Sequence, residues 1–467
     1  MKRWSHPILN LILLLAAGYW LAAGRSAAPL SVAEAAAPSE LNPVTAGAQM
    51  APTATPAPLP GRARIVIANN LSVKLAIDKW DLWATGGPHL RGANVYQRRT
   101  YPELEGTYNG PGPVGTPFTQ EDFDRLAALG ANYVNISHPG LFTEEPPYVL
   151  DEAMQENLDH LLWLIAQADM FAVISFRTGP GRSEFTFFYG DEGSWFDESY
   201  YNEAVWEEEA AQGAWVEMWR YTARRYWRHP IVVGYDLMVE PNANHVRAGE
   251  WNPEKFYDAY RDTLYDWNPL ALRISAAIRE EDGHVPILIG GMGNSSVEWL
   301  PFLQPTGDPR TVYLAHQYTP HPYTHQDPDE TGELPLNYPG EFDVDHDGQI
   351  KSFNRFWLAK LLRTVDRFAA RHDAPMTVNE FGVKRWQPSA AAFMRDQMGL
   401  FEQRGWNYAI WAWASTWQEG LAYDAFNFTF GPDPDNHERT DSELLDVITG
   451  YWSRNKLRPS FVQFITD

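Results

Sequence analysis

The sequence predicts an α/β protein whose main part is a (β/α)8 TIM barrel. Short apolar runs alternate with longer amphipathic stretches, as in parallel strands joined by helices, and eight such runs can be counted. No Gly-rich phosphate-binding motif follows the first run, which argues against an open nucleotide-binding sheet. The chain has 467 residues, a length that an α/β barrel can fill with few additional domains.

Eight apolar runs are the candidate strands of this barrel. They are His89–Val95, Asn132–Ile136, Phe171–Phe176, Ile231–Met238, Pro286–Gly290, Thr311–His316, Met376–Glu380 and Asn407–Trp411. Two shorter runs precede them, Arg64–Ala68 and Val73–Ile77. We expect these two to pair as a small hairpin near the barrel floor.

Amphipathic stretches between the runs predict the crossover helices. They are Thr119–Leu129, Asp151–Ala168, Glu203–His229, Pro253–Arg279, Ser352–His372, Pro388–Arg404 and Ser442–Ser453. The first begins with Thr-x-x-Asp, a pattern like that of a capping box. The fifth crossover, Ser295–Leu303, is short.

The first residues have the pattern of an export signal. Met1-Lys2-Arg3 is basic, and residues 7–23 form an apolar stretch of signal-peptide length that is marginal for a bilayer core of ~30 Å. Small residues at Ala33-Glu34-Ala35 offer a cleavage site. We expect residues 1–26 to be a signal peptide or an uncleaved membrane anchor. The protein would then be secreted or extracytoplasmic, or anchored by residues 7–23.

Residues 27–60 are rich in Ala, Pro, Thr and Ser, as in the segment APTATPAPLP at 51–60. Such a composition has too few large apolar side chains to build a core, so we expect a disordered linker. It would hold the following folded domain, residues 61–467 with its small N-terminal hairpin, away from a membrane or cell wall.

Composition narrows the classes of partner. The formal net charge of -23 disfavours nucleic acid and anionic lipid as partners. The sequence contains no cysteine, which excludes disulfides, thiol nucleophiles and thiolate zinc sites. The 20 Trp residues suit both a large core and a sugar-binding cleft.

Two carboxylates stand at strand ends, where (β/α)8 barrels carry their chemistry: Glu240 on the fourth strand and Glu380 on the seventh. Cleavage of a glycosidic bond needs two carboxyl groups that flank it. The other candidates lie at further strand ends. They are Asn94, Asn135, His138, Arg177, Asn242, His316, Tyr318, Trp411 and Trp413.

Five segments carry a specific resemblance. They are Leu90–Asn94, Tyr235–Asn242, His316–Tyr318, Tyr338–Gly340 and Asn379–Gly382. They resemble, over about residues 86–455, glycoside hydrolase family 5, the cellulase-type family of the (β/α)8 clan that uses two glutamates. The resemblance implies a retaining glycosidase with a carbohydrate substrate, a β-glucan by default, and no required cofactor.

The resemblance also implies individual roles. Glu240 would be the general acid/base and Glu380 the nucleophile. Tyr318 would hydrogen-bond Glu380, and His316 would contact the acid/base or a sugar hydroxyl. Trp411 or Trp413 would stack on a pyranose ring.

Three positions depart from the family pattern. Val239 stands where the family has an Asn that contacts the substrate 2-hydroxyl, Asn135 stands near the usual Arg of the second strand, and Arg177 occupies the region of the third strand's His. Asn135, His138, Arg177 or Asn242 could take over the lost contact. The departures point to a divergent subfamily and keep open a catalytically inactive carbohydrate-binding barrel.

Arg177 and Arg182 lie together on a Gly/Pro-rich stretch after the third strand. They could contact an anionic or heavily hydroxylated substrate. The sequence favours the other reading, in which they pair with nearby acids. These acids are Glu184, Asp191 and Glu192.

Two patterns raise the question of metal. Asp343, Asp345 and Asp347 resemble the start of an EF-hand loop and suggest a structural calcium ion, although Asn354 stands where the bidentate Glu belongs. The alternative is an acidic turn whose Asp residues cap the following helix.

Three histidines, His316, His321 and His325, allow a zinc hydrolase as a minor alternative. Pro320 and Pro322 should break any helix that would give the His-x-x-x-His spacing. Sensitivity of the activity to chelators would separate this alternative from a two-glutamate mechanism.

Overall fold

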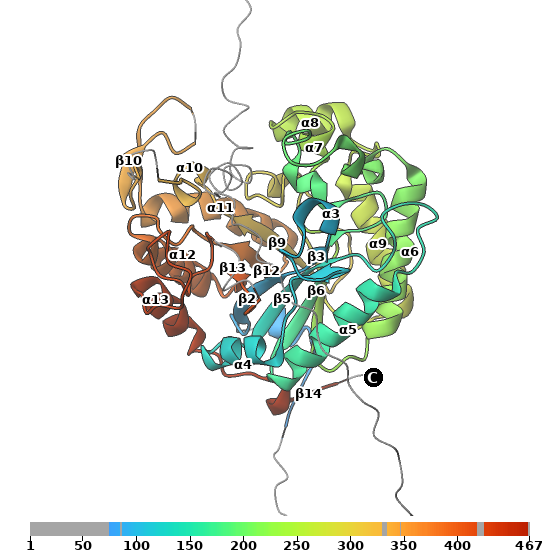
Figure 1. Ribbon diagram of the computed structural model, residues 1–467, viewed down its shortest axis with the longest axis horizontal. Coiled ribbons are helices and arrows are strands. Elements are labelled where there is room, and N and C mark those ends of the chain that lie inside the picture. Colours follow the sequence, from blue (N-terminus) through green and yellow to red (C-terminus); the bar gives the residue numbers. More distant parts are fainter. Residues whose placement is uncertain (1–73, 85, 329–333, 346, 418–424, 466–467) are drawn as a thin grey trace, which may run out of the picture. The chain divides into compact units, whose positions relative to one another are not determined.

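The computed structural model describes residues 74–84, 86–328, 334–345, 347–417 and 425–465 (Figure 1). The chain divides into two units, Met1–Val73 and Lys74–Asp467. The predicted leader, the linker and the run Arg64–Ala68 therefore lie outside the described residues. Within the part that the structure describes, no helix has both the length and the apolar character needed to cross a membrane.

Eight parallel strands close into a barrel, as the sequence predicts, in the order β12-β13-β2-β5-β6-β7-β8-β9. Their bounds are β2 Arg91–Tyr96, β5 Tyr133–Pro139, β6 Phe171–Thr178, β7 Val232–Asp236, β8 Ile287–Ile289, β9 Thr311–Gln317, β12 Met376–Phe381 and β13 Asn407–Trp413. Most strand residues are buried, because helices cover the outside and side chains fill the inside. Strand β7 ends at Asp236, earlier than predicted, although the Leu237 and Val239 amides still donate to the carbonyls of Leu288 in β8 and Phe176 in β6.

Seven longer helices form the outer layer that surrounds the strands in Figure 1. They are α4 Gln120–Ala128, α5 Glu152–Gln167, α6 Glu209–Tyr226, α9 Trp267–Glu281, α11 Arg355–His372, α12 Ala390–Arg404 and α13 Glu443–Trp452. At the start of α4 the Thr119 amide donates to the Asp122 carboxylate at 2.7 Å, as the capping pattern predicts. The short fifth crossover is a 3-10 turn, Leu300–Phe302.

Two predicted helices are interrupted. The stretch 203–229 begins with a 3-10 turn, Ala204–Trp206, before α6. The stretch 253–279 divides into α8, Pro253–Tyr260, and α9. The Asp266 carboxylate starts α9 afresh by accepting the Asn268 amide at 2.9 Å.

The remaining elements are short. They are helices α2 Asp81–Ala84, α3 Pro102–Glu105, α7 Ala243–Val246 and α10 His321–Thr324, and strands β3 Arg98–Arg99, β4 Val114–Gly115, β10 Gly340–Phe342 and β11 Lys351–Phe353. Strands β3 and β4 pair with each other, as do β10 and β11. Both pairs are antiparallel and lie outside the barrel sheet.

The barrel floor corrects the predicted hairpin. The described part of the second run, β1 (Leu75–Ile77), pairs in parallel with a strand at the other end of the chain, β14 (Val462–Phe464). Helix α2 follows, and its Trp83 indole donates to the Val233 carbonyl at 2.9 Å. A small core cluster joins these elements to the starts of the strands and closes this end of the barrel.

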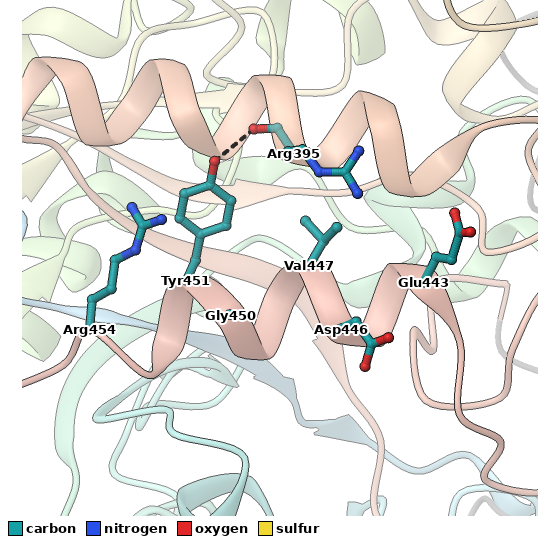
Figure 2. A pocket seen from close by; sticks show the side chains of 7 residues that line it. All are labelled: Arg395, Glu443, Asp446, Val447, Gly450, Tyr451 and Arg454. Atoms are coloured by element: carbon teal, nitrogen blue, oxygen red, sulfur yellow. Dashed lines mark hydrogen bonds between the residues drawn. The ribbon is translucent and has the colours of Figure 1, made fainter.

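A surface groove lies between α12 and α13, on the outside of the barrel (Figure 2). Arg395, Glu443, Asp446 and Arg454 line it, and the Tyr451 hydroxyl crosses it to the Arg395 carbonyl at 2.9 Å. Its lining includes none of the predicted site residues.

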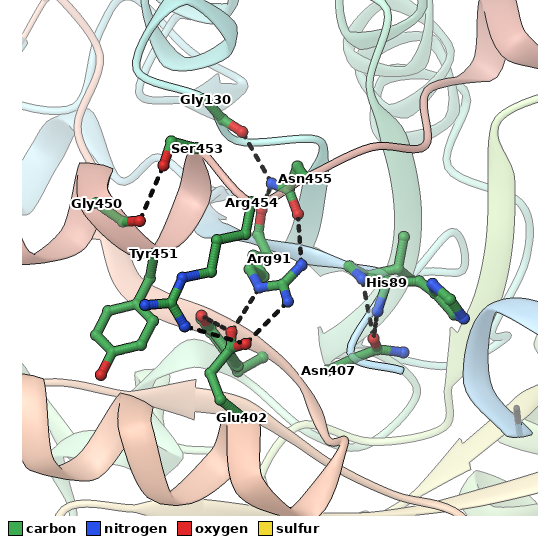
Figure 3. Close-up of polar contacts among 12 residues, drawn as sticks. His89, Arg91, Gly130, Glu402, Asn407, Gly450, Tyr451, Ser453, Arg454 and Asn455 are labelled. Carbon is green, nitrogen blue, oxygen red and sulfur yellow. Dashed lines mark hydrogen bonds and ion pairs between the residues drawn. The ribbon is translucent and has the colours of Figure 1, made fainter. Parts of the chain in front are cut away.

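A buried polar network fixes the start of β2 (Figure 3). The Arg91 guanidinium donates to Glu402 of α12 at 2.6 and 3.0 Å and to Asn455 at 3.1 Å. The Asn407 side chain accepts the amides of His89 and Leu90. These contacts hold the amino-terminal rim of the barrel, opposite the end that carries the predicted chemistry.

Candidate active site

Glu240 and Glu380 meet at the carboxyl-terminal rim of the barrel. Glu380 lies in β12 and is in register with His316 of β9. Glu240 follows β7 in a left-handed backbone conformation, with φ of 54°. Ligand atoms of Glu240, His316 and Glu380 all lie within 4.8 Å of one another. The side chains of the two glutamates are 18% and 8% exposed, so both open onto the rim while remaining mostly buried.

His316 and Tyr318 hold the two carboxyl groups. The His316 Nδ1 lies 2.9 Å from Glu240 Oε1 and 3.8 Å from Glu380 Oε2. The Tyr318 hydroxyl donates to Glu380 Oε1 at 2.9 Å. Each carboxyl therefore has a protein partner that fixes its orientation, and the histidine faces both.

Burial and mutual charge set the ionisation of this group. Burial raises the pKa of Glu380 to about 7, against the opposing charge of His316. Burial also favours a higher pKa for Glu240, but the hydrogen bond and charge of His316, together with Arg177, outweigh it and hold that pKa below its usual value. Two close, buried carboxyls resist joint ionisation, so the pair holds one proton near neutral pH and titrates as a unit.

His316 carries the balancing charge. Burial alone would lower the pKa of His316, but Glu380 and Glu240 raise it to about 9. Asp236 lies beneath, with its carboxylate accepting the Asn379 amide at 2.8 Å. Burial raises the pKa of Asp236 to about 6.

Arg177 lies among aromatic rings, and its positive charge favours the ionised form of both Glu240 and Glu380. Its guanidinium stacks on the Phe187 ring at 3.5 Å and lies 5.0 Å from the Tyr96 ring and 5.9 Å from the Trp411 ring. Its Nε donates to both oxygens of Glu184, at 3.1 and 3.2 Å. Arg177 thus pairs with an acid of its own loop, as the sequence favours, whereas the hydrogen bonds of Arg182 go to backbone carbonyls and to Asn242 instead.

Trp411 and Trp413 occupy different environments. Trp411 is half-buried, and its ring centre lies 5.6 Å from that of Tyr96 at the rim. Trp413 is 2% exposed, and its indole donates to the Asp122 carbonyl at 3.1 Å. Of the two tryptophans, Trp411 is the one that contacts Arg177 and Tyr96, and it is therefore the candidate for the sugar-stacking face.

With this geometry in place, comparison with known proteins is informative. Residues 97–416, more than half of the chain, match the family model "Cellulase (glycosyl hydrolase family 5)". The chain belongs to glycosyl hydrolase family 5. It is accordingly a glycosidase that hydrolyses O-glycosyl compounds.

Relatives of this family 5 chain are distant. Endoglucanase C of Acetivibrio thermocellus is 22% identical over 321 residues, which cover 63% of this chain and 84% of that protein. Cellodextrinase A of Ruminococcus flavefaciens is 22% identical over 265 residues, 56% of this chain and 68% of that protein. The crystal structure of the Thermotoga maritima endoglucanase Cel5A superposes with a TM-score of 0.56 at 19% identity, over 80% of this chain and 100% of that one. This structural likeness speaks to the fold.

Several candidates of this family 5 barrel lie within its wall and make their contacts there. The Asn94 amide donates to the carbonyls of Asn379, Ala409 and Ile410, and its oxygen accepts Asn135 at 2.7 Å. The Asn135 oxygen in turn accepts the Ser175 hydroxyl at 2.8 Å. Both asparagines are at most 2% exposed, so the structure does not bring them to the rim.

Asn242 and His138 are similarly engaged. Asn242 accepts from Arg182 at 3.3 Å and donates to the Thr186 hydroxyl at 2.9 Å. The His138 ring faces the Pro139 carbonyl and the Asn157 side chain of α5, and burial lowers its pKa to about 4. Of the four replacements considered for the missing 2-hydroxyl contact, Asn135, His138 and Asn242 are engaged within the protein, whereas the charge of Arg177 acts on both glutamates.

The three histidines of the zinc alternative do not lie together as a metal site would require. His321 and His325 face each other across a one-turn helix, α10, with ring centres 5.0 Å apart. The prolines thus start a helical turn at its first positions, where they are tolerated, and the expectation of no helix was wrong. His316 instead turns to the glutamates, and no metal-type cluster of the described residues joins the three histidines.

The acidic turn lies between β10 and β11. The oxygens of Asp343, Asp345 and Asp347 lie within 4.8 Å of one another. The Lys351 ammonium contacts Asp345 and Asp347 at 2.6 Å. Helix α11 is capped by Asn354, whose oxygen accepts the amides of Phe356 and Trp357, so the expectation that the Asp residues cap it was wrong.

Sequence reasoning named Arg182 and Glu184 only as charged residues of one loop, and it missed their supporting roles and those of Phe187 and Asp236. Glu184, Phe187 and Arg182 all come from the Gly/Pro-rich loop after β6, and Asp236 comes from the end of β7. The concentration of charged and aromatic residues on that loop was the available signal. Their partners, however, lie on other strands and could not be read from spacing.

Proposed function

We propose that this family 5 enzyme is a retaining glycosidase that acts on β-glucans, with Glu240 as acid/base and Glu380 as nucleophile. The observation that carries the proposal is the close approach of the two carboxyl groups, with atoms of both within 4.8 Å. A short separation suits direct attack by one carboxylate, whereas inverting enzymes keep the groups further apart to admit a water.

In the first step the Glu380 carboxylate attacks the anomeric carbon. The bond from that carbon to the glycosidic oxygen breaks, and the leaving oxygen takes the proton from Glu240. In the second step Glu240 removes a proton from water, the water oxygen attacks the same carbon, and the Glu380 carboxylate is released. In the free protein the raised pKa of Glu380 and the lowered pKa of Glu240 favour the shared proton on Glu380. The cycle needs this proton to pass to Glu240 when substrate binds, and it requires no cofactor.

The residues around the pair suggest how a sugar is held. Trp411 would offer a flat apolar face to a pyranose ring. Arg177 would donate to hydroxyls beside the reacting carbon, because Glu184 engages its Nε and its positive charge acts on both glutamates. Hydrogen bonds to the 2-hydroxyl strengthen in the transition state. The choice of a β-glucan rests on the printed activities of the relatives, endoglucanases and a cellodextrinase.

Hydrolysis of a panel of β-glucans, β-mannans and aryl β-glycosides tests the proposal. Glu380→Gln and Glu240→Gln should each lose most of the activity on β-glucans, while Glu217→Gln, an isosteric change at an exposed site, should retain it. Cleavage of β-mannans but not β-glucans would overturn the substrate class. Binding of sugars without cleavage would favour the inactive barrel, and full activity in Glu380→Gln would refute the mechanism.

We also propose that the protein is exported, and tethered if its leader is retained. The support is the sequence of residues 1–60 alone. Cell fractionation of the full-length protein, with mass determination of the product, tests this. Loss of residues 7–23 from an extracytoplasmic product indicates a cleaved signal, and retention in membranes indicates an anchor. A full-length cytoplasmic product would contradict both.

A further inference from the structure

Arg182 is a fully buried cation that the proposed mechanism does not use. It is 0% exposed. Its guanidinium donates hydrogen bonds to groups of the chain around Glu240. Its Nη1 reaches the carbonyls of Arg177 at 2.9 Å and Val239 at 2.8 Å. Its Nη2 reaches the carbonyl of Glu240 at 2.8 Å and the Asn242 side chain at 3.3 Å. One side chain thus binds the chain on both sides of the proposed acid/base.

The backbone that Arg182 grips is an unfavourable one. Glu240 has φ of 54°, a left-handed conformation that is unfavourable for non-glycine residues and that persists only where surrounding contacts impose it. The backbone hydrogen bonds that tie this segment to the sheet are made by the Leu237 and Val239 amides, and they stop short of Glu240. The carbonyl of Glu240 itself accepts the guanidinium, so this contact acts at the strained residue.

Further contacts fix the position of the segment around Glu240 relative to Arg182. The Val239 amide donates to the Phe176 carbonyl at 2.8 Å, which ties the segment to β6. The side-chain amide of Asn242 donates to the hydroxyl of Thr186, which lies on the same loop as Arg182. The buried Glu203 carboxylate favours the charged guanidinium, against a burial that lowers the pKa of Arg182 to about 10. The cation therefore remains charged at neutral pH and keeps its donors.

We propose that Arg182 is a positioning residue that imposes the left-handed backbone at Glu240 and so aims its carboxyl at the leaving-group oxygen. The inference rests on the proposed role of Glu240 as proton donor. It differs from a general stabilising role, because only steps that need this proton should depend on it.

Leaving-group dependence separates the two roles. The dinitrophenolate leaving group of a dinitrophenyl β-glycoside departs with little protonation. The phenolate of a phenyl β-glycoside needs a proton from Glu240 to leave. In Arg182→Lys and Arg182→Met, kcat/KM for the phenyl substrate should fall about 100-fold, since misplacement by about 1 Å can cost that much. In the same variants, kcat/KM for the dinitrophenyl substrate should change less than about threefold. For the dinitrophenyl substrate kcat and KM should fall together, because Glu240 also acts as base in the second step and the glycosyl-enzyme accumulates when that step slows.

Arg91→Lys is the matched control, a buried guanidinium at the opposite rim of the barrel (Figure 3). It should lower the melting temperature without changing the ratio between the two substrates. Equal losses on both substrates in Arg182→Lys would overturn the proposal. Arg182→Lys alone decides the matter if Arg182→Met does not fold, because the lysine keeps the charge but has fewer donors.

Failure of the underlying function would look different. Glu240→Gln would then keep full activity on the phenyl substrate, whatever Arg182 does. Loss in Glu240→Gln that spares the dinitrophenyl substrate, together with the same pattern in Arg182→Lys, supports the positioning role. Loss in Glu240→Gln with an unchanged ratio in Arg182→Lys overturns it.

Discussion

Asn94 and Asn135 hydrogen-bond each other and the barrel wall, whereas Arg177 lies over Phe187 with its Nε paired to Glu184. All three stand at strand ends in the sequence. Their partners, rather than their positions, decide whether they can meet a sugar. A buried amide that left its partners to bind substrate would forfeit about 1–3 kcal/mol for the group left unpaired.

Removal of Arg177 should weaken the contact with the sugar hydroxyl beside the reacting carbon. Arg177→Met should lower kcat/KM for an aryl β-glucoside by about 100-fold, because a charge-assisted hydrogen bond made in the transition state is lost. The same change should cost much less with the matching 2-deoxyglucoside, which has no hydroxyl to lose. Equal losses on both substrates would show that Arg177 does not act on the 2-hydroxyl.

The pH profile should report the shared proton of Glu240 and Glu380. As the pH rises through the pKa of about 7, the pair loses its remaining proton, so kcat/KM for substrates that need protonation should fall above pH 7. The Tyr318 hydrogen bond lowers the pKa of Glu380, so Tyr318→Phe should move the profile to higher pH. It should also cut kcat/KM at the optimum by about tenfold. A profile that keeps its position in Tyr318→Phe would contradict this assignment.

At the level of elements, a register shift in β13 decides which tryptophan faces the substrate. Residues 411 and 413 share parity, so simple alternation would place both on one face. The pairing of β13 with β2 shifts between Ile410 and Trp413, and the irregularity turns the two rings to different environments. The sequence pattern could not have distinguished them.

Substitution of each tryptophan should therefore have opposite consequences. Trp411→Ala should lower kcat/KM about tenfold with little change in stability, because a half-buried stacking face is lost. Trp413→Ala should lower the free energy of unfolding by about 3–5 kcal/mol, because it opens a cavity in the core. Steady-state kinetics and chemical denaturation measure both. Reversed effects would assign the sugar face to Trp413.

The acidic turn between β10 and β11 gives a prediction about calcium. Lys351 already neutralises Asp345 and Asp347, so millimolar Ca²⁺ should barely raise the melting temperature of the wild type. In Lys351→Gln the three carboxylates lose that partner, and Ca²⁺ should stabilise the variant. Thermal unfolding with Ca²⁺ or EDTA measures this. A clear Ca²⁺ effect in the wild type would indicate a resident ion instead.

At the scale of the molecule, the eight strands and their closure were predictable, because apolar runs and amphipathic helices repeat in a regular order. The partner of β1 was not, because it lies near the other end of the chain, at Val462–Phe464. The breaks before α6 and α9 were also missed, since a local cap such as Asp266 interrupts a stretch that remains amphipathic.

The candidate site, like the fold, was predictable where local motifs define it and not where distant contacts do. Motifs placed Glu240, Glu380, His316 and Tyr318 at strand ends, and closure of the barrel brings them together. The contacts of Arg182 with the carbonyls of Val239 and Glu240 depend on how one loop folds across neighbouring strands, which no local pattern encodes. The catalytic roles themselves remain predictions for experiment.

Capture of the covalent intermediate tests the central proposal most directly. A 2-deoxy-2-fluoro β-glucoside with a good leaving group slows the second step more than it prevents the first, so a retaining enzyme accumulates the glycosyl-enzyme. Mass spectrometry of the digested protein should find one sugar added to the peptide that contains Glu380, and none in Glu380→Gln. A label on another carboxylate would move the nucleophile elsewhere, and hydrolysis with no covalent adduct would contradict a retaining mechanism.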